Sequence, residues 1–253
     1  MEKKPIPLLG IPILNRGDLL ERLICSIDYP VQKLFIVNNG NDIGVLQVIH
    51  KKVNGLNENI KEVVVYTPEK NLGVAGSWNT IINENMDCPY WVISANDMMF
   101  SESGSVEKMA FYAEQNHLTN AMMYVDGYSC FCMTQLGLKE VGTFDENIFP
   151  AYLEDSDHFY RLRLSGAIAT GFPDVKFIHG EPPNYGSSTI NSNDKYQKAN
   201  GITHGRNFEY YFKKWGGRGG EEIFKNPFND SSKSIKFWEL DVERRKIQEE
   251  TWK

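Results

Sequence analysis

The stretch IPLLGIPILNRGDLLERLICSIDYPVQKLFIVNNGND, residues 6–42, determines the fold that we predict for this chain. It begins with a short apolar run, Ile6 to Leu14, that is typical of a buried strand, and Asp18 then lies where it can cap or begin a helix. The helix is indicated by apolar residues at helical spacing, namely Leu19, Leu20, Leu23, Ile24 and Ile27. A second apolar strand, Leu34 to Val37, ends in a turn at residues 38–42. This order of strand, helix and strand is typical of a parallel sheet covered by helices.

The same alternation continues to residue 94. Val45 to Val53 has the pattern of a helix, whereas Glu62 to Tyr66 and Tyr90 to Ser94 have the pattern of strands. Between these strands, Gly73 and Gly76 open a helix with an apolar face. The sequence therefore predicts an α/β fold with a mainly parallel sheet and helices on both faces. Ligands of such sheets bind outside the carboxyl ends of the strands.

The second half of the chain has a less regular pattern. The strands that we expect there are Met122 to Val125, Phe131 to Thr134 and Val175 to Ile178. The helices that we expect are Asp155 to Leu164, Lys195 to Lys214 with its poor helix formers Gly201 and Gly205, and Ile235 to Trp252. The glycine run at residues 216–220 follows no strand and predicts a flexible turn. No repeat or linker divides the chain, which indicates one compact unit.

Composition excludes several classes of protein. The 253 residues carry a net charge of −6, and nucleic-acid binders normally have a basic surplus, so we expect no nucleic-acid partner. Four cysteines in a chain of this length are too few for a disulfide framework, and they do not have the spacing of a zinc site. This indicates buried free thiols in a reducing compartment. No apolar run approaches the roughly 20 residues that cross a bilayer. Prolines interrupt the apolar N-terminal stretch, so we expect a cytoplasmic protein without a transmembrane segment.

Motifs of several common enzyme classes are missing from the sequence. It contains no G-x-x-x-x-G-K-[ST], no G-x-G-x-x-G after a strand, no G-x-S-x-G and no H-E-x-x-H. The sequence therefore lacks the residues that P-loop enzymes, dinucleotide-binding enzymes, serine hydrolases and zincins need for their chemistry.

Polar and small residues follow the expected strand ends and have two interpretations each. The pairs Asn15–Arg16 and Asn38–Asn39 can hydrogen-bond a base or a ribose, or they can form ordinary Asx turns. Residues 71–79 bring small side chains to a helix start, which suits either an anion bound by backbone N–H groups or close helix packing. Asp97 follows the fourth strand, where a carboxylate can hold a divalent cation or cap a turn. His179 also follows a strand, although a lone histidine there indicates an ordinary surface or core residue.

Three acids share one expected helical turn. Asp157 can pair with Arg161 at i,i+4, whereas Glu154 and Asp155 have no such partner. Crowded carboxylates repel one another, and they are what a general base or a metal site requires. The pattern therefore favours a functional role for Glu154 and Asp155.

The order of these segments resembles the inverting family-two glycosyltransferases of the GT-A fold. The resemblance covers nearly the whole chain up to His179, through residues 11–16, 36–40, 71–76, 96–97 and 154–157. Its most specific element is the Glu-Asp-x-Asp segment with the preceding Phe144-Asp145-Glu146. Residues 210–217 are similar to the tail of small members that build surface polysaccharides or glycoprotein glycans.

The resemblance implies a GT-A-like fold, in which a mainly parallel Rossmann-like sheet merges with a smaller acceptor-binding part. It implies a nucleotide-sugar-binding half at residues 1–100, a catalytic and acceptor half at residues 101–215, and a C-terminal tail with a helix at residues 216–253. It also implies a hexosyltransferase of polysaccharide biosynthesis, which moves a sugar from a UDP-linked donor to a glycan or another hydroxyl acceptor with inversion.

The functional residues of the family are carried over position by position. Asp155 matches the catalytic base and has Glu154 beside it, Asp97 matches the last acid of the metal-binding D-x-D, and His179 matches the histidine that completes a site for Mn²⁺ or Mg²⁺. Asn38 occupies the place of an aspartate that reads the base. The donor-binding residues implied in this way are Pro12, Asn15, Arg16, Asn38, Asn71, Gly73, Gly76, Asn79, Asn96 and Asp97.

Two departures from the family pattern keep alternatives open. Ala95 takes the first D-x-D position, which motivates a nucleotide-sugar-binding module without transferase activity. Asn38 in place of aspartate leaves the preference for a uridine nucleotide open. A sugar nucleotidylyltransferase is the other alternative, although residues 14–17 match its Gly-rich loop poorly.

The aromatic residues Tyr152, Phe149 and Trp215 are candidates for stacking on the acceptor sugar or for the core. The glycosyltransferase hypothesis requires that Asp97, His179 and Asp155 meet at one cleft.

Overall fold

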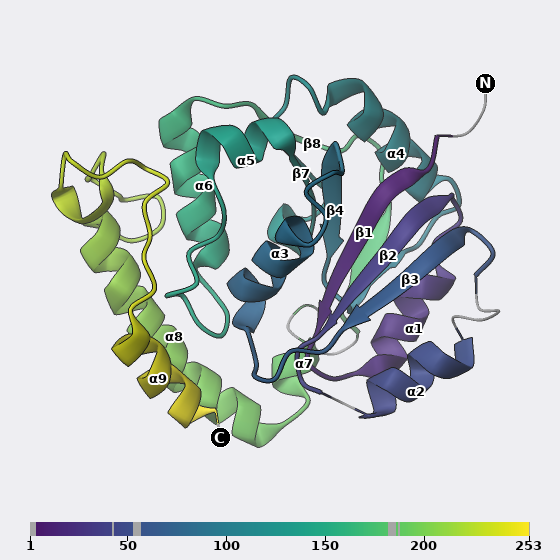
Figure 1. Cartoon of the computed structure of the whole chain (residues 1–253), viewed down its shortest axis with the longest axis horizontal. Helices are drawn as coiled ribbons and strands as arrows, with labels where there is room; N and C mark the ends of the chain where they lie inside the picture. Colours follow the sequence, from purple (N-terminus) through teal and green to yellow (C-terminus); the bar gives the residue numbers. More distant parts are fainter. Residues whose placement is uncertain (1–3, 42, 53–56, 182–185, 187, 253) are drawn as a thin grey trace.

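The computed structural model describes residues 4–41, 43–52, 57–181, 186 and 188–252. Its main sheet is seven-stranded, in the order β3-β2-β1-β4-β7-β6-β8 (Figure 1). The strands of this sheet are β1 (Ile6–Ile13), β2 (Val31–Asn38), β3 (Ile60–Tyr66), β4 (Tyr90–Ser94), β6 (Met122–Tyr124), β7 (Cys130–Thr134) and β8 (Ala169–Gly171). The predicted strands of the first 94 residues are all present, and so are β6 and β7.

The sheet is mainly parallel, as the sequence predicts. β1 pairs in parallel with β2 on one side and with β4 on the other, and β2 pairs in parallel with β3. The direction reverses at β7, which is antiparallel to both β4 and β6. The carboxyl ends of β1, β2, β3 and β4 therefore lie along one edge of the sheet.

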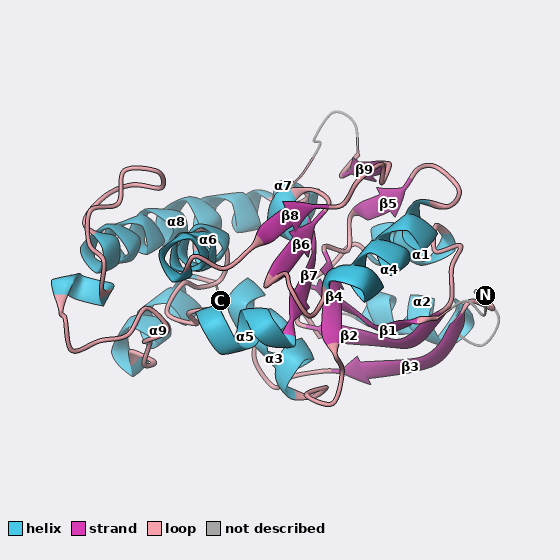
Figure 2. Cartoon of the chain, turned by 90° about the horizontal axis from the view of Figure 1, so that it is seen from above, coloured by secondary structure: helices cyan, strands magenta, loops and turns pink. Residues whose placement is uncertain are grey.

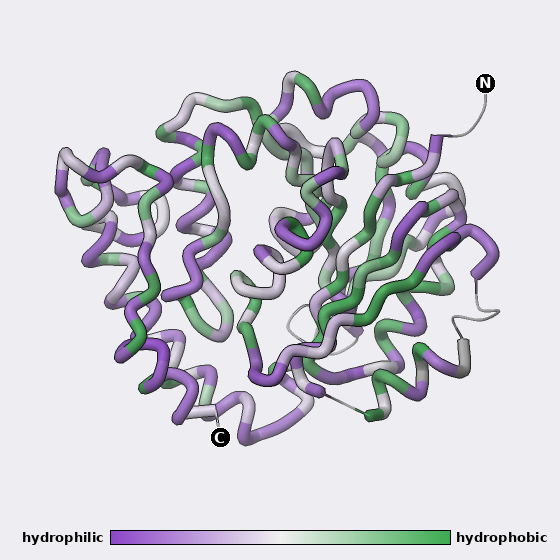
Figure 3. The backbone as a smooth tube through the Cα atoms, in the orientation of Figure 1, coloured by the Kyte–Doolittle hydropathy of each residue, from purple (hydrophilic) through white to green (hydrophobic). Residues whose placement is uncertain are grey.

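Helices cover both faces of the sheet (Figure 2). α1 (Gly17–Cys25), α2 (Ile43–Lys52) and α4 (Ser105–Asn116) contribute to one apolar core, and α3 (Gly73–Asn83) and α5 (Gln135–Val141) contribute to the other. β1 shows why two cores form, because Leu8 and Leu9 point to opposite sides of the strand and enter different cores. Figure 3 shows how apolar residues concentrate along β1, β2 and β3. Val53, the last residue of the helix predicted at α2, lies outside the described residues.

A small second sheet joins distant parts of the chain. It consists of β5 (Met98–Phe100) and β9 (Phe177–His179), which are antiparallel, and Met98 pairs with His179. The N–H of Gly180 also donates to the carbonyl of Asp97 at 2.9 Å. This backbone pairing brings Asp97, which immediately precedes β5, next to the end of β9.

The remaining helices are α6 (Glu154–Ser165), α7 (Ser188–Asn191), α8 (Asp194–Trp215) and α9 (Val242–Thr251), with short 3-10 turns η1 (Gly127–Ser129) and η2 (Pro227–Asn229). In Figure 1, α6, α8 and α9 lie on the left, and α7 lies near the ends of β1, β2 and β3. α8 continues through both of its glycines. The helix predicted from Ile235 is too long, because Asp241 caps α9 by accepting from the N–H of Arg244. None of the described helices is long and apolar enough to cross a bilayer.

The prediction of buried thiols holds for three cysteine positions and fails at one. Cys88, Cys130 and Cys132 are buried, and the last two lie on β7 inside the sheet. Cys25 is exposed, because it ends α1 on the side that faces away from the core.

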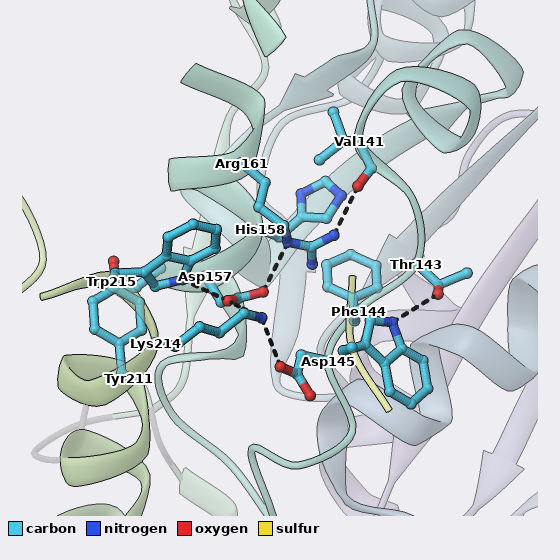
Figure 4. Close-up of polar contacts among 12 residues, drawn as sticks. Val141, Thr143, Phe144, Asp145, Asp157, His158, Arg161, Tyr211, Lys214 and Trp215 are labelled. Atoms are coloured by element: carbon cyan, nitrogen blue, oxygen red, sulfur yellow. Dashed lines mark hydrogen bonds and ion pairs between the residues drawn. The ribbon is translucent and has the colours of Figure 1, made fainter. Parts of the chain in front are cut away.

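Lys214 of α8 forms a buried double ion pair with two aspartates (Figure 4). Its Nζ lies 2.6 Å from Oδ2 of Asp145 and 2.7 Å from Oδ1 of Asp157, and no part of these three side chains is exposed. Asp157 also accepts from Nε of Arg161 at 2.8 Å, which confirms the predicted i,i+4 pair. Burial alone raises the pKa of Asp157, but the charges of Lys214 and Arg161 outweigh burial and lower this pKa to about 2.

We predict that Lys214→Met lowers the free energy of unfolding by about 3–5 kcal/mol, because Asp145 and Asp157 stay buried and lose their ammonium partner. Urea denaturation followed by circular dichroism measures this change. Lys213→Met is the matched control, since Lys213 is an exposed neighbour on the same helix, and we expect it to change stability by at most about 0.5 kcal/mol. Equal effects of the two variants would contradict a special role for Lys214.

Candidate active site

A cavity of about 410 Å³ lies at the carboxyl edge of the sheet. Its walls come from the ends of β1 and β4, from the starts of α3 and α6, from η1, and from the residue that follows α9. The predicted site residues that line it are Pro12, Asn71, Gly73, Asn96, Asp97, Glu154, Asp155 and His179. The predicted site residues that lie outside it are Asn15, Arg16, Asn38, Gly76 and Asn79. The required meeting of Asp97, His179 and Asp155 at one cavity is present.

At the end of β2, the cavity is lined by Asn39 and not by Asn38. Asn38 is the last residue of β2 and is fully buried. Neighbouring residues of an extended chain point to opposite sides, so a shift by one residue exchanges the two environments. Asn39 also orders the cavity wall, since its Nδ2 donates to Oδ1 of Asn71 at 2.7 Å and its Oδ1 accepts from the N–H of Leu72 at 2.7 Å.

Arg16 and Asn15 make contacts beside the cavity. Arg16 is the N-cap residue of α1, has a φ of 64°, and donates to Oδ1 of Asp18 at 2.9 Å and to Oε1 of Glu181 at 2.6 Å. Nδ2 of Asn15 lies 3.4 Å from Oγ of Ser192, which precedes α8. Both residues therefore connect the end of β1 to segments that follow β9.

The start of α3 has its first backbone N–H groups bonded within the protein. The N–H of Gly73 donates to Oδ1 of Asn71 at 2.8 Å, and the N–H of Val74 donates to the carbonyl of Pro150 at 2.7 Å. Gly73 has a φ of 74°, and a Cβ at this position would lie 2.8 Å from both the Phe149 ring and the Pro150 carbonyl. The geometry thus favours the packing interpretation of this segment over anion binding.

Asn79 and Gly76 have packing roles on the far side of α3. Asn79 bonds both backbone groups of Phe144, with its Nδ2 donating to the carbonyl and its Oδ1 accepting from the N–H, each at 2.8 Å. A Cβ on Gly76 would lie 3.1 Å from Cβ of Leu72. Both residues hold α3 against its neighbours.

His179 lies between two carboxylates. Its Nε2 is 3.4 Å from Oδ1 of Asp97, and its Nδ1 is 2.8 Å from Oδ2 of Asp126. The hydrogen bond to Asp97 raises the pKa of His179 against the opposing effect of burial, and Asp126 raises it further. Burial alone raises the pKa of Asp97, but His179 and the N–H of Ser188 outweigh burial and lower that pKa.

Asp97 and His179 have the donor atoms and the spacing that a divalent cation needs. A separation of 3.4 Å is close to that of two adjacent ligands that each lie roughly 2.1–2.3 Å from one ion. Asp126 would then fix the imidazole ring through Nδ1, as carboxylates do for metal-ligating histidines. Within the described ranges, no group of three or more His, Cys, Asp or Glu is placed to hold an ion. A cation at this place would thus have Asp97 and His179 as its two protein ligands, and a bound substrate and water would supply the others.

Glu154 and Asp155 begin α6 in different environments. Glu154 is 6% exposed, and its Oε2 has no hydrogen-bond partner among the described residues. Burial, together with the charge of Asp155, raises the pKa of Glu154 well above its usual value, which favours a neutral carboxyl group. Asp155 is half-buried, and its Oδ1 accepts from the N–H of Ser156 at 2.6 Å. Of these two acids, Asp155 is the one that suits a proton acceptor.

Aromatic side chains form much of the cavity wall. Trp78 stacks on Tyr128 with ring centroids 6.0 Å apart, and Trp252 stacks on Tyr196 at 5.5 Å. Tyr152, a predicted stacking residue, lines the cavity. For Phe149 and Trp215 the sequence left a place in the core as the alternative, and both are buried, with 1% and 0% of their surface exposed. Phe149 packs beneath Arg245 of α9, and Trp215 packs against Tyr160 of α6.

Sequence reasoning missed several residues of the cavity. Asp126 follows a predicted strand, so the rule that located Asp97 and His179 would also have found it. Trp252 had no local signal, because Arg245 of α9 positions this helix by donating to the carbonyls of Asn71 and Leu72 at 3.1 and 3.0 Å. Contacts of that sequence separation cannot be read from a local pattern.

Known proteins with a similar structure share the fold. The chain is similar to residues 1–349 of S. aureus TarS, a family-two glycosyltransferase of the GT-A type, with a TM-score of 0.51, 15% identity and coverage of 68% of this chain and 59% of that one. A TarS 1–349 structure in complex with UDP-GlcNAc has a TM-score of 0.53 and 13% identity over 71% of this chain and 59% of that one. The fold is therefore GT-A-like, as the resemblance implied.

One curated protein is similar in sequence over a short segment. A galactofuranosyl glycosyltransferase of Leishmania donovani is 37% identical over 59 residues, which are 23% of this chain and 14% of the relative. The chain thus spans less than two thirds of the length of these relatives. No protein-family model matches the sequence.

We predict that Asp126→Asn lowers the pKa of His179 in the metal-free protein, because the substitution removes a carboxylate 2.8 Å from Nδ1. Since folding raises this pKa, the interaction stabilises the protein below about pH 6.5 and is lost as pH rises through the folded-state value. NMR titration of the imidazole measures the shift. Asp87→Asn, at an exposed position, serves as the control, and an unchanged His179 titration in Asp126→Asn would disprove the coupling.

Proposed function

We propose that this protein is an inverting glycosyltransferase that moves a sugar from a UDP-linked donor to a hydroxyl group of a glycan. The observation that carries the proposal is that one cavity on a GT-A-like fold is lined by Asp97, His179 and Asp155 together. Transfer from a sugar nucleotide needs a cation site, because the diphosphate is anionic, and Asp97 with His179 would form it. Transfer also needs a proton acceptor such as Asp155, because the acceptor hydroxyl must lose a proton.

Asp155 is the proposed general base. An acceptor hydroxyl is a weak nucleophile, and a positioned carboxylate takes its proton as the oxygen attacks the anomeric carbon. The new bond to that carbon forms as the bond to the diphosphate oxygen breaks, so one displacement inverts the anomeric centre. Asp155 suits this role because it is half-buried, lines the cavity and is oriented by Ser156.

Asp97 and His179 are the proposed ligands of a divalent cation, Mn²⁺ or Mg²⁺. Such an ion stabilises the negative charge that develops on a leaving diphosphate. An imidazole ligand suits Mn²⁺ better than Mg²⁺, which prefers oxygen. The protein itself fixes the two donor atoms through the backbone pairing of β5 with β9, and Asp126 holds the ring of His179 in place.

Support for a uridine donor comes from structures with the same fold. TarS 1–349 was crystallised with UDP-GlcNAc and with UDP. The cavity wall also offers amide groups at Asn39, Asn71 and Asn96 that can hydrogen-bond a base or a ribose. The donor sugar is best tested with a panel that includes UDP-GlcNAc, UDP-galactose and UDP-galactofuranose.

We predict that Asp155→Asn lowers the rate of transfer by about 10²- to 10⁴-fold and leaves donor affinity within about twofold, because the amide keeps the shape of the side chain but cannot accept the proton. Transfer is measured with radiolabelled donors, and donor binding is measured by calorimetry. Asp87→Asn, at an exposed position, is the matched control. Near-normal transfer by Asp155→Asn would rule out Asp155 as the base, and donor binding without any transfer by the wild type would favour a binding module.

We predict that a cognate donor stabilises the protein more with Mn²⁺ than without it, and that Asp97→Ala removes the difference. A donor at 100 times its dissociation constant raises the free energy of unfolding by about 2.7 kcal/mol. Thermal unfolding with and without Mn²⁺, for both proteins, measures this dependence. An identical response of Asp97→Ala and the wild type to the metal would refute the ligand role.

A further inference from the structure

A second hollow, of about 300 Å³, adjoins the cavity. Gly127, Tyr128 and Asp155 line both spaces, so these residues form their common wall. The other walls of the second hollow come from Met122 and Tyr124 of β6 and from Ser156 and Phe159 of α6. Its volume is at the low end of the range of small-molecule sites.

The position of Asp155 between the two spaces matches the geometry of a single displacement. An incoming hydroxyl must approach the anomeric carbon from the side opposite the leaving diphosphate, and the base must contact that hydroxyl. Asp97 and His179 line the cavity but not the second hollow. A diphosphate beside these two residues would therefore leave the second hollow for the acceptor.

The walls of the second hollow have the chemistry of a sugar site. Phe159 is 45% exposed although it is a large apolar residue, and Tyr124 and Tyr128 add two further rings. The C–H groups on one face of a sugar ring carry partial positive charge and pack well on the negative face of an aromatic ring. Asp155, which lines both spaces, and Ser156, which lines the second hollow, supply polar atoms for the hydroxyl groups of a sugar.

Tyr128 is held rigidly in the common wall. Its hydroxyl lies 2.8 Å from Nδ1 of the buried His158, and its ring stacks on Trp78. A fixed ring loses little conformational freedom when a ligand binds, which favours recognition by shape.

We infer that the second hollow binds a sugar ring of the acceptor, with Phe159 and Tyr124 as its aromatic walls. The inference rests on the proposed function, because it takes Asp155 as the base that the acceptor must reach. To the glycan acceptor of that function it adds the place where one sugar ring binds and the residues that contact the ring. Phe159 is thereby assigned as a residue that determines acceptor specificity.

The test uses saturation-transfer NMR on the full chain, with methyl β-D-galactopyranoside, methyl β-N-acetylglucosaminide and glycerol 3-phosphate as probes. We expect the wild type to bind at least one ring probe more tightly than glycerol 3-phosphate, and Phe159→Ala to weaken that binding about 3- to 10-fold. Phe159→Tyr should retain it, because the aromatic face remains. Phe111→Ala is the matched control, since Phe111 of α4 is 60% exposed and lines neither space.

The outcomes separate this inference from the proposed function. Ring binding that survives Phe159→Ala, or that is no tighter than the binding of glycerol 3-phosphate, overturns the inference, and a loss of transfer in Asp155→Asn would still support the function. Ring binding that Phe159→Ala removes supports the hollow as a sugar site even if no donor is ever transferred. In a transfer assay, Phe159→Ala should raise the KM for the acceptor and leave the KM for the donor unchanged.

Discussion

Lys214 reaches from α8 into a space closed to water and meets Asp145 and Asp157 there. An ammonium group that leaves water loses its hydration, so it is stable only where carboxylates replace the lost contacts at short range. Here the two carboxylates come from different segments: Asp145 lies in the loop between α5 and α6, and Asp157 lies in the first turn of α6. Because Asp155 lies two residues before Asp157, the position of the proposed base depends on a lysine from the far end of α8.

The three acids at the start of α6 differ in their surroundings, and these surroundings determine whether each side chain is charged and whether it contacts the cavity. Asp157 is fully buried and stays ionised because two cations contact it. Glu154 is buried and contacts no cation in the part of the chain that the structure describes, so the neutral form is favoured. Asp155 remains in contact with the cavity. The sequence presents these residues as one acidic run, and the surroundings that α8 and the cavity provide make them chemically distinct.

Local patterns predicted the parts of the fold that depend on local forces. Apolar runs located β1, β2, β3 and β4, since each of these strands is covered by helices, and strand ends located Asp97 and His179. The sequence pointed to Asn38, whereas Asn39 lines the cavity, because the sequence at a strand end does not indicate which of two neighbouring residues faces outward. The predicted start of the last helix failed because Asn147, far away in sequence, bonds the N–H of Asp241 and holds it outside the helix. Trp252 reaches the cavity through contacts of the same long range.

The pairing of β5 with β9 has a consequence for how this architecture tolerates change. Asp97 and His179 are adjacent because Met98 lies opposite His179 in the antiparallel pairing of β5 with β9, and the N–H of Gly180 donates to the carbonyl of Asp97. We expect that insertions or deletions in those loops between β5 and β9 that do not line the cavity leave this pairing intact. Such loops are therefore places where new recognition elements can be added without moving Asp97 and His179 apart.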